Sequence, residues 1–291
     1  MSDVSPFFDK VVVVTGASSG FGAEAALELA RRGAHVVLAA RSEQTLRDLA
    51  ARCEAEEGGC AALAVPTDVS RRSDVERLAD EARRRFGKID AWINNAGVGV
   101  IGRFDEVPIE DHEQVVRTNL LGCLYGSYEA LRYFRRTGLG VLINVASVVG
   151  KIPAPLYSSY VATKFGIVGF SDALRQELKA DGVDGIHVCT VMPMAHSTEF
   201  FDHAGNYTGR EASPIPPVYD PRVTVDKLVE LVVHPEDEAI TGWQGGVFNT
   251  FHKLMPGAVE KLMSARTQKA QFVDAEPAPQ TSGAIHQPSG V

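Results

Sequence analysis

Near its N-terminus the chain reads Lys10-Val-Val-Val-Val-Thr-Gly16-Ala-Ser-Ser-Gly20-Phe-Gly22, and this stretch decides the fold. Its four consecutive valines predict a strand that is buried on both faces, as strands of parallel sheets are. A helical stretch over 23–32 and a second apolar strand over 35–40 follow. Because a strand, a glycine-rich turn, a helix and a strand make a βαβ unit, we expect the chain to begin with one.

The glycines of the turn have a physical reason. Gly16 permits a tight turn away from the strand, whereas Gly20 and Gly22 let the backbone approach a pyrophosphate and let the helix pack closely on the sheet. The N–H groups at the start of the helix would then bind the phosphates. The turn therefore predicts a dinucleotide-binding site.

The same alternation of elements continues along the chain. We expect further strands over 61–65, 89–93, 141–146, 186–192 and 239–241, and helices over 43–57, 70–86, 110–136, 158–180 and 221–234. Strands that alternate with helices indicate an α/β fold with a parallel sheet. One such domain fits a chain of 291 residues.

A second stretch, from Ser147 to Lys164, carries the candidate chemistry. Tyr160 and Lys164 stand four residues apart, so on a helix they share one face, about 6 Å apart along the axis. A free tyrosine has a pKa near ~10, and an adjacent positive charge lowers that pKa. Ser147, at the end of its strand, could add a hydroxyl, so the stretch predicts an activated proton donor.

Three polar residues each allow a functional and a structural interpretation. Arg41 follows the second strand, where an acidic residue would bind the ribose 2′-OH of NAD and an arginine suits the 2′-phosphate of NADP. We favour NADP over a merely solvated arginine. Asp68 could accept a hydrogen bond from an adenine amino group or cap a helix. Asn119, on an apolar helical stripe, could make a structural hydrogen bond or hold a water near the active site.

Composition limits the classes of function. The formal charge of −8, from 29 basic and 37 acidic residues, argues against a general nucleic-acid binder. The four cysteines lack metal-ligand spacing and are expected to be reduced thiols of a cytoplasmic protein. The N-terminus lacks the pattern of a secretory signal, and no run of about 18 apolar residues predicts a transmembrane helix.

The pattern changes after the strand over 186–192, so the main domain is expected to span 8–245. Residues 195–222 are irregular and rich in Phe, Tyr and Pro, which predicts a partly apolar lid over a substrate. Residues 246–270 form an amphipathic extension, expected as two helices divided at Pro256. It would pack on the domain or on a second subunit, with contact to a membrane surface less favoured. The composition of 271–291 predicts a disordered tail.

Taken together, these motifs resemble the short-chain dehydrogenase/reductase family over roughly residues 8 to 200. The resemblance rests on Thr15-Gly-x-x-x-Gly20-x-Gly22, Asn94-Asn-Ala-Gly97, Asn119, Ser147 and Tyr160-x-x-x-Lys164, in that order. It implies a Rossmann-like, doubly wound parallel sheet of about seven strands flanked by helices, with NAD(P) at the carboxyl ends of the strands. It also implies a homodimer or homotetramer.

The resemblance implies roles for single residues. Tyr160 would be the general acid for carbonyl reduction, and Lys164 would lower its pKa and bind the nicotinamide ribose. Ser147 would hold the substrate oxygen, and Asn119 would anchor a water. Further residues implied at the cofactor are Gly16, Ser18, Ser19, Gly20, Phe21, Gly22, Arg41, Asp68, Val69, Asn95, Ala96, Gly97, Pro193 and Thr198. Two positions depart from the family: Met194 stands where glycine usually follows the proline, and the turn has phenylalanine where isoleucine or leucine is commoner.

The sequence thus predicts an NAD(P)-dependent, NADP-preferring oxidoreductase that acts on a carbonyl/secondary alcohol pair and needs no metal. The apolar residues over 152–157 and 200–219 favour a fairly hydrophobic small molecule as substrate. A protein of another class, a cofactor-binding regulator or scaffold with little turnover, is the alternative. The intact Ser147, Tyr160 and Lys164 argue against it.

Overall fold

A computed structural model describes residues 5–196, 200–242, 256–269, 272 and 275–288. Its centre is a seven-stranded sheet in which all neighbouring strands are parallel. In chain order the strands are β1 (Val11–Thr15), β2 (His35–Ala40), β3 (Ala62–Pro66), β4 (Ala91–Asn94), β6 (Gly140–Val145), β7 (Ile186–Pro193) and β9 (Glu238–Thr241). The predicted α/β, Rossmann-like fold is therefore confirmed.

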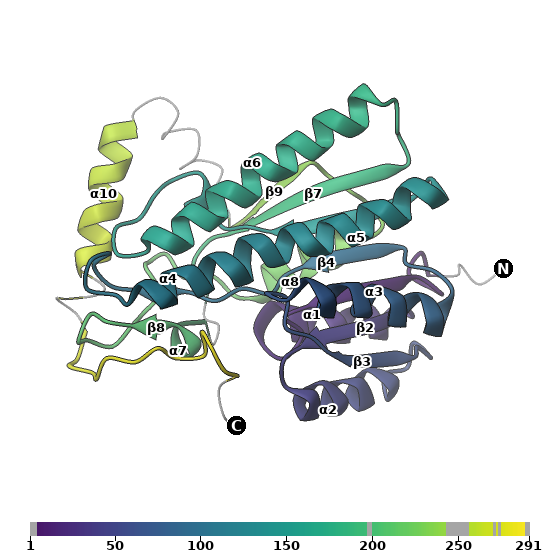
Figure 1. Ribbon diagram of the computed structural model, residues 1–291, viewed down its shortest axis with the longest axis horizontal. Coiled ribbons are helices and arrows are strands. Elements are labelled where there is room, and N and C mark those ends of the chain that lie inside the picture. Colours follow the sequence, from purple (N-terminus) through teal and green to yellow (C-terminus); the bar gives the residue numbers. More distant parts are fainter. Residues whose placement is uncertain (1–4, 197–199, 243–255, 270–271, 273–274, 289–291) are drawn as a thin grey trace.

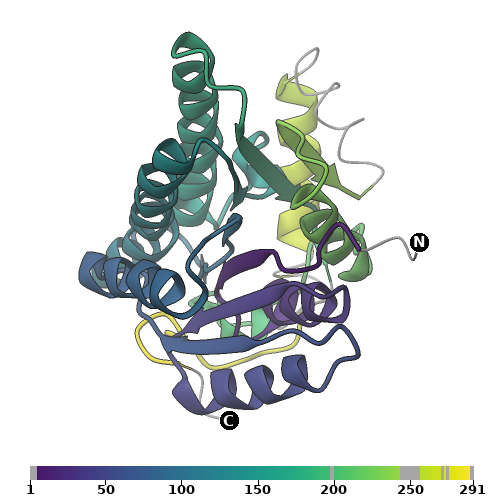
Figure 2. The same cartoon turned by 90° about the vertical axis from the view of Figure 1, so that its right-hand side faces the viewer.

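Helices cover both faces of this sheet (Figures 1 and 2). The valines of β1 show why, because successive side chains of a strand point to opposite faces. Val12 and Val14 are buried in the core on one side of the sheet, and Val11 and Val13 in the core on the other. One layer contains α1 (Gly20–Arg31), α2 (Glu43–Glu54) and α8 (Arg222–Leu231); the other contains α3 (Arg72–Phe86), α5 (Gly122–Thr137) and α6 (Ser158–Ala180). Among the described residues, none of the helices is long and apolar enough to cross a membrane.

The strand order is β3-β2-β1-β4-β6-β7-β9. From β1 the chain builds one half of the sheet outward, then returns to place β4 beside β1 and builds the other half. In such sheets the ligand crevice lies at the carboxyl ends of the strands, where the strand order reverses. The turn after β1 and the segment 95–97 after β4 therefore meet at this crevice.

The helix predicted over 110–136 is divided in the structure. α4 (Ile109–Val116) passes into a π-helical turn, η1 (Arg117–Leu121), which leads into α5. Asn119 lies in this turn, and its side chain bonds the backbone of Val98 on a neighbouring segment. A single π-helical turn shifts the helical phase, which the apolar spacing of the sequence does not reveal.

The segment after β7 is mostly irregular, as expected. It contains two short elements, α7 (Phe200–His203) and β8 (Gly205–Asn206). β8 pairs with a short strand near the crevice, β5 (Val100–Ile101), in parallel. The remaining described elements are the 3-10 turn η2 (Val148–Gly150) and α10 (Pro256–Gln268), which begins at the proline expected to divide 246–270. The first half of that stretch and Thr198 lie outside the described residues.

Residues 275–288 correct the disorder expected for 271–291. Thr281 and Asn206 exchange two backbone hydrogen bonds, at 2.7 and 2.9 Å, and Ile285 is fully buried. Figure 1 shows this yellow segment running beside α7 and β8. Pairing with an edge strand and one buried isoleucine thus order a segment whose average composition predicts no core.

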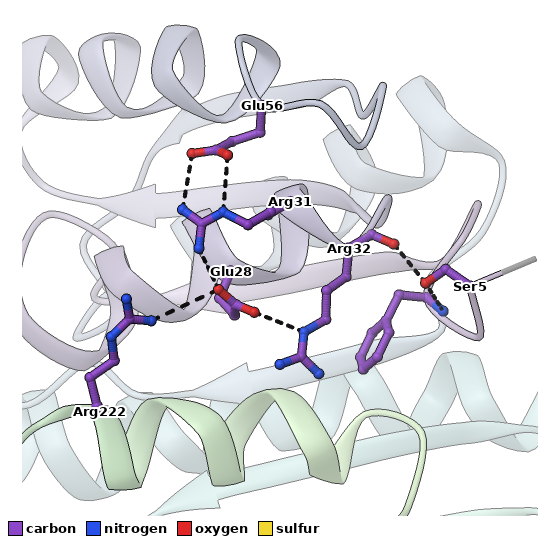
Figure 3. Close-up of polar contacts among 7 residues, drawn as sticks. Ser5, Glu28, Arg31, Arg32, Glu56 and Arg222 are labelled. Carbon is purple, nitrogen blue, oxygen red and sulfur yellow. Dashed lines mark hydrogen bonds and ion pairs between the residues drawn. The ribbon is translucent and has the colours of Figure 1, made fainter.

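A charge network fastens α1 to the elements around it (Figure 3). Glu28, whose side chain is 14% exposed, accepts hydrogen bonds from Arg31 at 2.6 Å and from Arg32 at 2.9 Å. Arg31 also pairs with Glu56, just past α2, at 3.1 Å. Arg222, at the start of α8, lies 3.9 Å from Glu28. These contacts hold together the helical layer behind the glycine-rich turn.

Candidate active site

Two glycines of the turn after β1 are packed too tightly to carry side chains. A Cβ atom on Gly22 would lie 2.3 Å from the carbonyl oxygen of Gly16, and a Cβ on Gly16 would lie 2.7 Å from Cα of Ala96. Asn95 holds the turn from the β4 side, because its Nδ2 donates to the carbonyl oxygens of Thr15 and Gly16 at 3.0 and 3.1 Å. Close approach of two backbones therefore explains these glycines.

The third glycine faces open space. Gly20 has a φ of +53°, and a Cβ atom there would meet nothing within 4 Å. α1 begins at this residue, and the first N–H groups of a helix have no partner inside the helix. The open space belongs to a cavity of about 580 Å³. The turn and the start of α1 therefore face this cavity with backbone donors that suit an anion.

The cavity brings together most of the predicted site residues. Those that line it are Gly16, Ser18, Ser19, Gly20, Phe21, Arg41, Asp68, Val69, Asn95, Ala96, Gly97, Ser147, Tyr160, Lys164 and Pro193. Of the other described candidates, Gly22 packs behind the turn and Asn119 behind the segment after β4. The glycine-rich turn and the Ser-Tyr-Lys group thus face one cavity, although Gly22 and Ser147 are 125 positions apart in the sequence.

Ser147, Tyr160 and Lys164 come from two elements that meet at the cavity. Ser147 follows β6, whereas Tyr160 and Lys164 lie one turn apart on α6. The Ser147 hydroxyl hydrogen-bonds the Tyr160 phenol and lies 3.3 Å from the carbonyl oxygen of Pro193. Lys164 Nζ lies 5.4 Å from the centroid of the Tyr160 ring and donates to the carbonyl oxygen of Val145 at 2.9 Å. The predicted arrangement of phenol, ammonium and hydroxyl is present.

Burial moves both titrating groups away from their ordinary pKa values. It raises the pKa of Tyr160 to about 12, because the cost of burying a phenolate exceeds the favourable hydrogen bond from Ser147. It also lowers the pKa of Lys164 to about 8, against a smaller opposing effect of Cys123. Burial and the hydrogen bond from Ser147 thus account for the pKa of Tyr160 in the chain by itself. The expected lowering of this pKa by Lys164 stays a prediction.

Asn119 uses its side chain for structural hydrogen bonds. It is 1% exposed. Its Oδ1 accepts from the N–H of Val98 at 2.8 Å, and its Nδ2 donates to the carbonyl oxygen of Val98 at 2.9 Å and to Oγ1 of Thr163 at 3.2 Å. Because Thr163 precedes Lys164 on α6, these bonds tie the segment after β4 to the helix that carries the candidate proton donor.

Arg41 and Asp68 line the cavity, and both side chains already form hydrogen bonds within the chain. Asp68 Oδ1 accepts from the N–H and the hydroxyl of Ser70 at 3.0 and 2.7 Å, which fixes the turn before α3. The capping interpretation is wrong, because the N-cap residue of α3 is Arg71 and no side chain caps it. Arg41 donates from Nη2 to the carbonyl oxygen of Ala284 at 2.7 Å and from Nη1 to that of Ile285 at 3.2 Å. No pattern in the sequence indicated that the C-terminal segment reaches Arg41.

Sequence reasoning also missed His196. This residue lines the cavity and is 4% exposed. Its ring nitrogens contact the carbonyl oxygen of Met194 at 2.7 Å and Oγ1 of Thr224 at 3.1 Å, and its ring lies edge-on to Phe21 at 5.2 Å. Burial lowers its pKa. A single histidine in an irregular segment carries no spacing signal that could have found it. Other residues missed are Arg266, Ala284 and Pro288.

The cavity wall beside Tyr160 is apolar. The rings of Phe200 and Tyr160 lie 5.3 Å apart. Gly99 makes room for Phe200, because a Cβ on Gly99 would lie 2.4 Å from its Cζ. Other apolar residues of this wall are Ile152, Ala154, Tyr157, Phe201 and Ile215. Three of the residues named for this wall, Phe200, Phe201 and Ile215, come from the segment 195–222.

The donor set of the cavity fits a dinucleotide. The N-terminus of α1, the open face at Gly20 and the guanidinium of Arg41 would hold phosphates. Lys164 and Gly97 lie next to one another, since a Cβ on Gly97 would be 3.8 Å from Lys164 Nζ. These two residues would border the part of a cofactor nearest Tyr160.

Known proteins match this chain over most of its length. The family model for short chain dehydrogenases matches residues 10–206. The uncharacterized oxidoreductase YxnA of Bacillus subtilis is 31% identical over 280 residues, which are 96% of this chain and 78% of that protein. The 3beta-hydroxysteroid dehydrogenase 1 of Eggerthella lenta is 36% identical over 233 residues, which are 79% of this chain and 84% of that protein.

Solved structures agree with this placement. An alcohol dehydrogenase from the archaeon Thermococcus sibiricus, complexed with 5-hydroxy-NADP, has a TM-score of 0.69 and 27% identity, covering 79% of this chain and 95% of that one. A 3-ketoacyl-(acyl-carrier-protein) reductase from Brucella melitensis, complexed with NADH, has a TM-score of 0.68 and 27% identity, covering 80% of this chain and 97% of that one. Because the family model spans most of the sheet and both cavity motifs, the chain belongs to the short-chain dehydrogenase/reductase family of oxidoreductases.

Proposed function

We propose that this chain is an NADP(H)-preferring oxidoreductase that interconverts a carbonyl group and a secondary alcohol on an apolar small molecule. The observation that carries the proposal is the convergence of Ser147, Tyr160 and Lys164 on the cavity that the glycine-rich turn also lines. The two related structures are complexes with 5-hydroxy-NADP and with NADH, which supports a nicotinamide cofactor here.

The chain's residues then handle the proton and the oxygen. When bound, the nicotinamide supplies the hydride. Tyr160 gives its phenolic proton to the carbonyl oxygen as a C–H bond forms at the carbonyl carbon, and Ser147 hydrogen-bonds the same oxygen. Lys164 stabilises the phenolate that remains. Because the pKa of Tyr160 is about 12 in the chain alone, the phenol is protonated at neutral pH. This is the state that carbonyl reduction requires, since the phenol is the proton donor.

The NADP preference rests on Arg41. It stands directly after β2, a strand that ends without an acidic residue, and it lines the cavity. A guanidinium suits the 2′-phosphate that distinguishes NADP from NAD. Thr198, outside the described residues, stays a predicted contact to the nicotinamide amide.

The apolar substrate class rests on the wall beside Tyr160. Phe200, Ile152 and Tyr157 line the cavity that also holds the Tyr160 phenol. A substrate that places its carbonyl against the phenol would pack against these apolar side chains. Steroid, lipid and aromatic ketones are the substrates that such a wall favours, because binding sites gain affinity by removing apolar surface from water. The hydroxysteroid dehydrogenase of Eggerthella lenta is a relative with a substrate of this kind in its name.

Substitution of Tyr160 tests the proposal. We expect wild-type protein to reduce members of a panel of steroid, lipid and aromatic ketones with NADPH, and Tyr160→Phe to lose about 100-fold or more of that rate, the usual contribution of a general acid. Tyr133→Phe, at a buried tyrosine outside the cavity, is the matched control. Wild-type rates in Tyr160→Phe would show that the proposed mechanism is wrong. Tight NADPH binding without turnover on any ketone would favour the regulator alternative.

A further inference from the structure

The C-terminal segment 275–288 ends at the part of the cavity where Arg41 lies. Ala284 and Pro288 line the cavity together with Arg41. Two terminal nitrogens of the guanidinium donate to the carbonyl oxygens of Ala284 and Ile285, at 2.7 and 3.2 Å. Residues more than 240 positions away in the chain therefore occupy the donors that the proposed function assigns to a 2′-phosphate.

The segment is held in place by its own anchors. Ile285 is fully buried beside Val100 and Val115, in a small apolar cluster next to the crevice. His286 Nε2 contacts a carboxylate oxygen of Asp111 at 2.7 Å, and Asp111 is 4% exposed. Gly283 has a φ of +56°, and a Cβ on it would lie 2.5 Å from two backbone carbonyl oxygens. These anchors therefore fix the positions of the two backbone carbonyl groups that contact Arg41.

The chemistry of these partners discriminates between the two cofactors. Carbonyl oxygens and phosphate oxygens are both acceptors, so they compete for the same N–H groups of Arg41. A ribose 2′-OH has a proton to donate, so it can lie beside a carbonyl without displacing it. Arg41 is half-buried, and two neutral carbonyls compensate its charge less well than a phosphate dianion would. The contact is therefore one that a phosphate can replace.

We propose that the backbone of Ala284 and Ile285 is a determinant of cofactor specificity: while docked it occupies Arg41 and weakens NADP(H) binding, whereas NAD(H) does not compete with it. The proposal rests on the proposed function, in which Arg41 binds the 2′-phosphate. When the docked state predominates, the apparent Kd for NADPH exceeds the intrinsic one by the inverse of the undocked fraction.

Point variants of the full chain test this inference. Gly283→Ala introduces a Cβ into the two backbone carbonyls of the docking site, and Ile285→Asp places a carboxylate in an apolar cluster, so both release the segment. Gly182→Ala is the matched control, because Gly182 has a similar φ of +67° and a Cβ there meets nothing within 4 Å. Fluorescence titration gives the Kd for NADPH and for NADH, and thermal melting reports folding.

We expect both releasing variants to bind NADPH about fivefold or more tightly than the wild type, with NADH changed by less than about twofold. Gly182→Ala should match the wild type for both cofactors. In the double variant Arg41→Ala/Gly283→Ala the gain for NADPH should vanish, because the released guanidinium is absent. 2′,5′-ADP and 5′-ADP, which differ only in the 2′-phosphate, should repeat the contrast without a nicotinamide.

A folded releasing variant with an unchanged ratio of NADPH to NADH affinity would overturn the inference, as would a gain that survives loss of Arg41. If releasing the segment weakened NADPH, the segment would be part of the cofactor site and the inference would again be wrong. Failure of the proposed function looks different: neither cofactor would bind to the folded wild type or to any variant.

Discussion

The ring of Phe200 lies against that of Tyr160, with centroids 5.3 Å apart and an angle of 54° between the planes. Phe200 comes from α7 and Tyr160 from α6, so the contact joins the segment after β7 to the helix with the proposed proton donor. The phenylalanine also occupies the space that the missing side chain of Gly99 leaves. This one ring therefore shapes the cavity beside the phenol.

Replacement of Phe200 should act on the substrate according to its size. We expect Phe200→Ala to raise the KM of a bulky apolar ketone about 30-fold, because a lost contact of this size is worth about 2 kcal/mol. A small ketone that does not reach the ring should change by less than about threefold in KM. Gly99→Ala should also raise the KM of the bulky ketone, because its Cβ would push the ring of Phe200 into the cavity and leave less room for the substrate. Equal effects on both ketones would contradict the position given to Phe200.

The strands could be predicted because the residues that identify them are adjacent in the sequence. Four buried valines mark β1, and the turn after β1 could be recognised from the spacing of Gly16 and Gly22. The docking of the C-terminal segment was not predictable, because it depends on one isoleucine in a polar stretch and on backbone carbonyls, which every sequence has. The raised pKa of Tyr160 was not predictable for a related reason. Spacing places a charge near a phenol, but the degree of burial depends on residues from other elements.

Carbonyl reduction should depend on pH through Lys164. Its pKa is lowered to about 8 by burial, so the ammonium that stabilises the Tyr160 phenolate is present below that pH and is lost above it. The pKa of Tyr160 is raised to about 12, so the phenol stays protonated across this range. We therefore expect kcat/KM for reduction to be constant at low pH and to fall above about pH 8, as one proton is lost.

Lys164→Arg provides the control for this pH profile. A guanidinium keeps its proton throughout the range, so any activity that the variant retains should show no fall near pH 8. A profile for the wild type that stays flat to pH 10, or a fall near pH 8 that persists in Lys164→Arg, would assign the titration to another group.

Asn119 should act through the stability of the fold more than through chemistry. Asn119→Ala leaves the N–H and the carbonyl oxygen of Val98, a half-buried residue, without their side-chain partners. We expect this to lower the free energy of unfolding by about 3 kcal/mol, since each unpaired buried group costs about 1–3 kcal/mol. Urea denaturation measures the loss. A water-holding role predicts the reverse pattern, with kcat strongly reduced and the free energy of unfolding unchanged.

Substitutions at two glycines of the turn should show that Gly22 serves packing and Gly20 serves binding. Gly22→Ala places a Cβ 2.3 Å from the carbonyl oxygen of Gly16, so the backbone must move. We expect a loss of about 3 kcal/mol in the free energy of unfolding, the upper range for overpacking. Gly20→Ala meets no atom within 4 Å and carries only the strain of its positive φ, about 1 kcal/mol.

Gly20→Ala should nevertheless weaken cofactor binding strongly, although it lowers the free energy of unfolding only a little. Its Cβ would enter the open space at the start of α1, which is where the proposed function places the pyrophosphate. Gly182→Ala has a similar strain at a φ of +67°, on the turn after α6, so it should lose the same stability and keep the wild-type Kd. Titration with NADPH and with NADH should show both cofactors weakened about tenfold or more in Gly20→Ala, since a displaced phosphate loses charge-assisted hydrogen bonds. Wild-type affinity in that variant would mean that the phosphates bind elsewhere in the cavity.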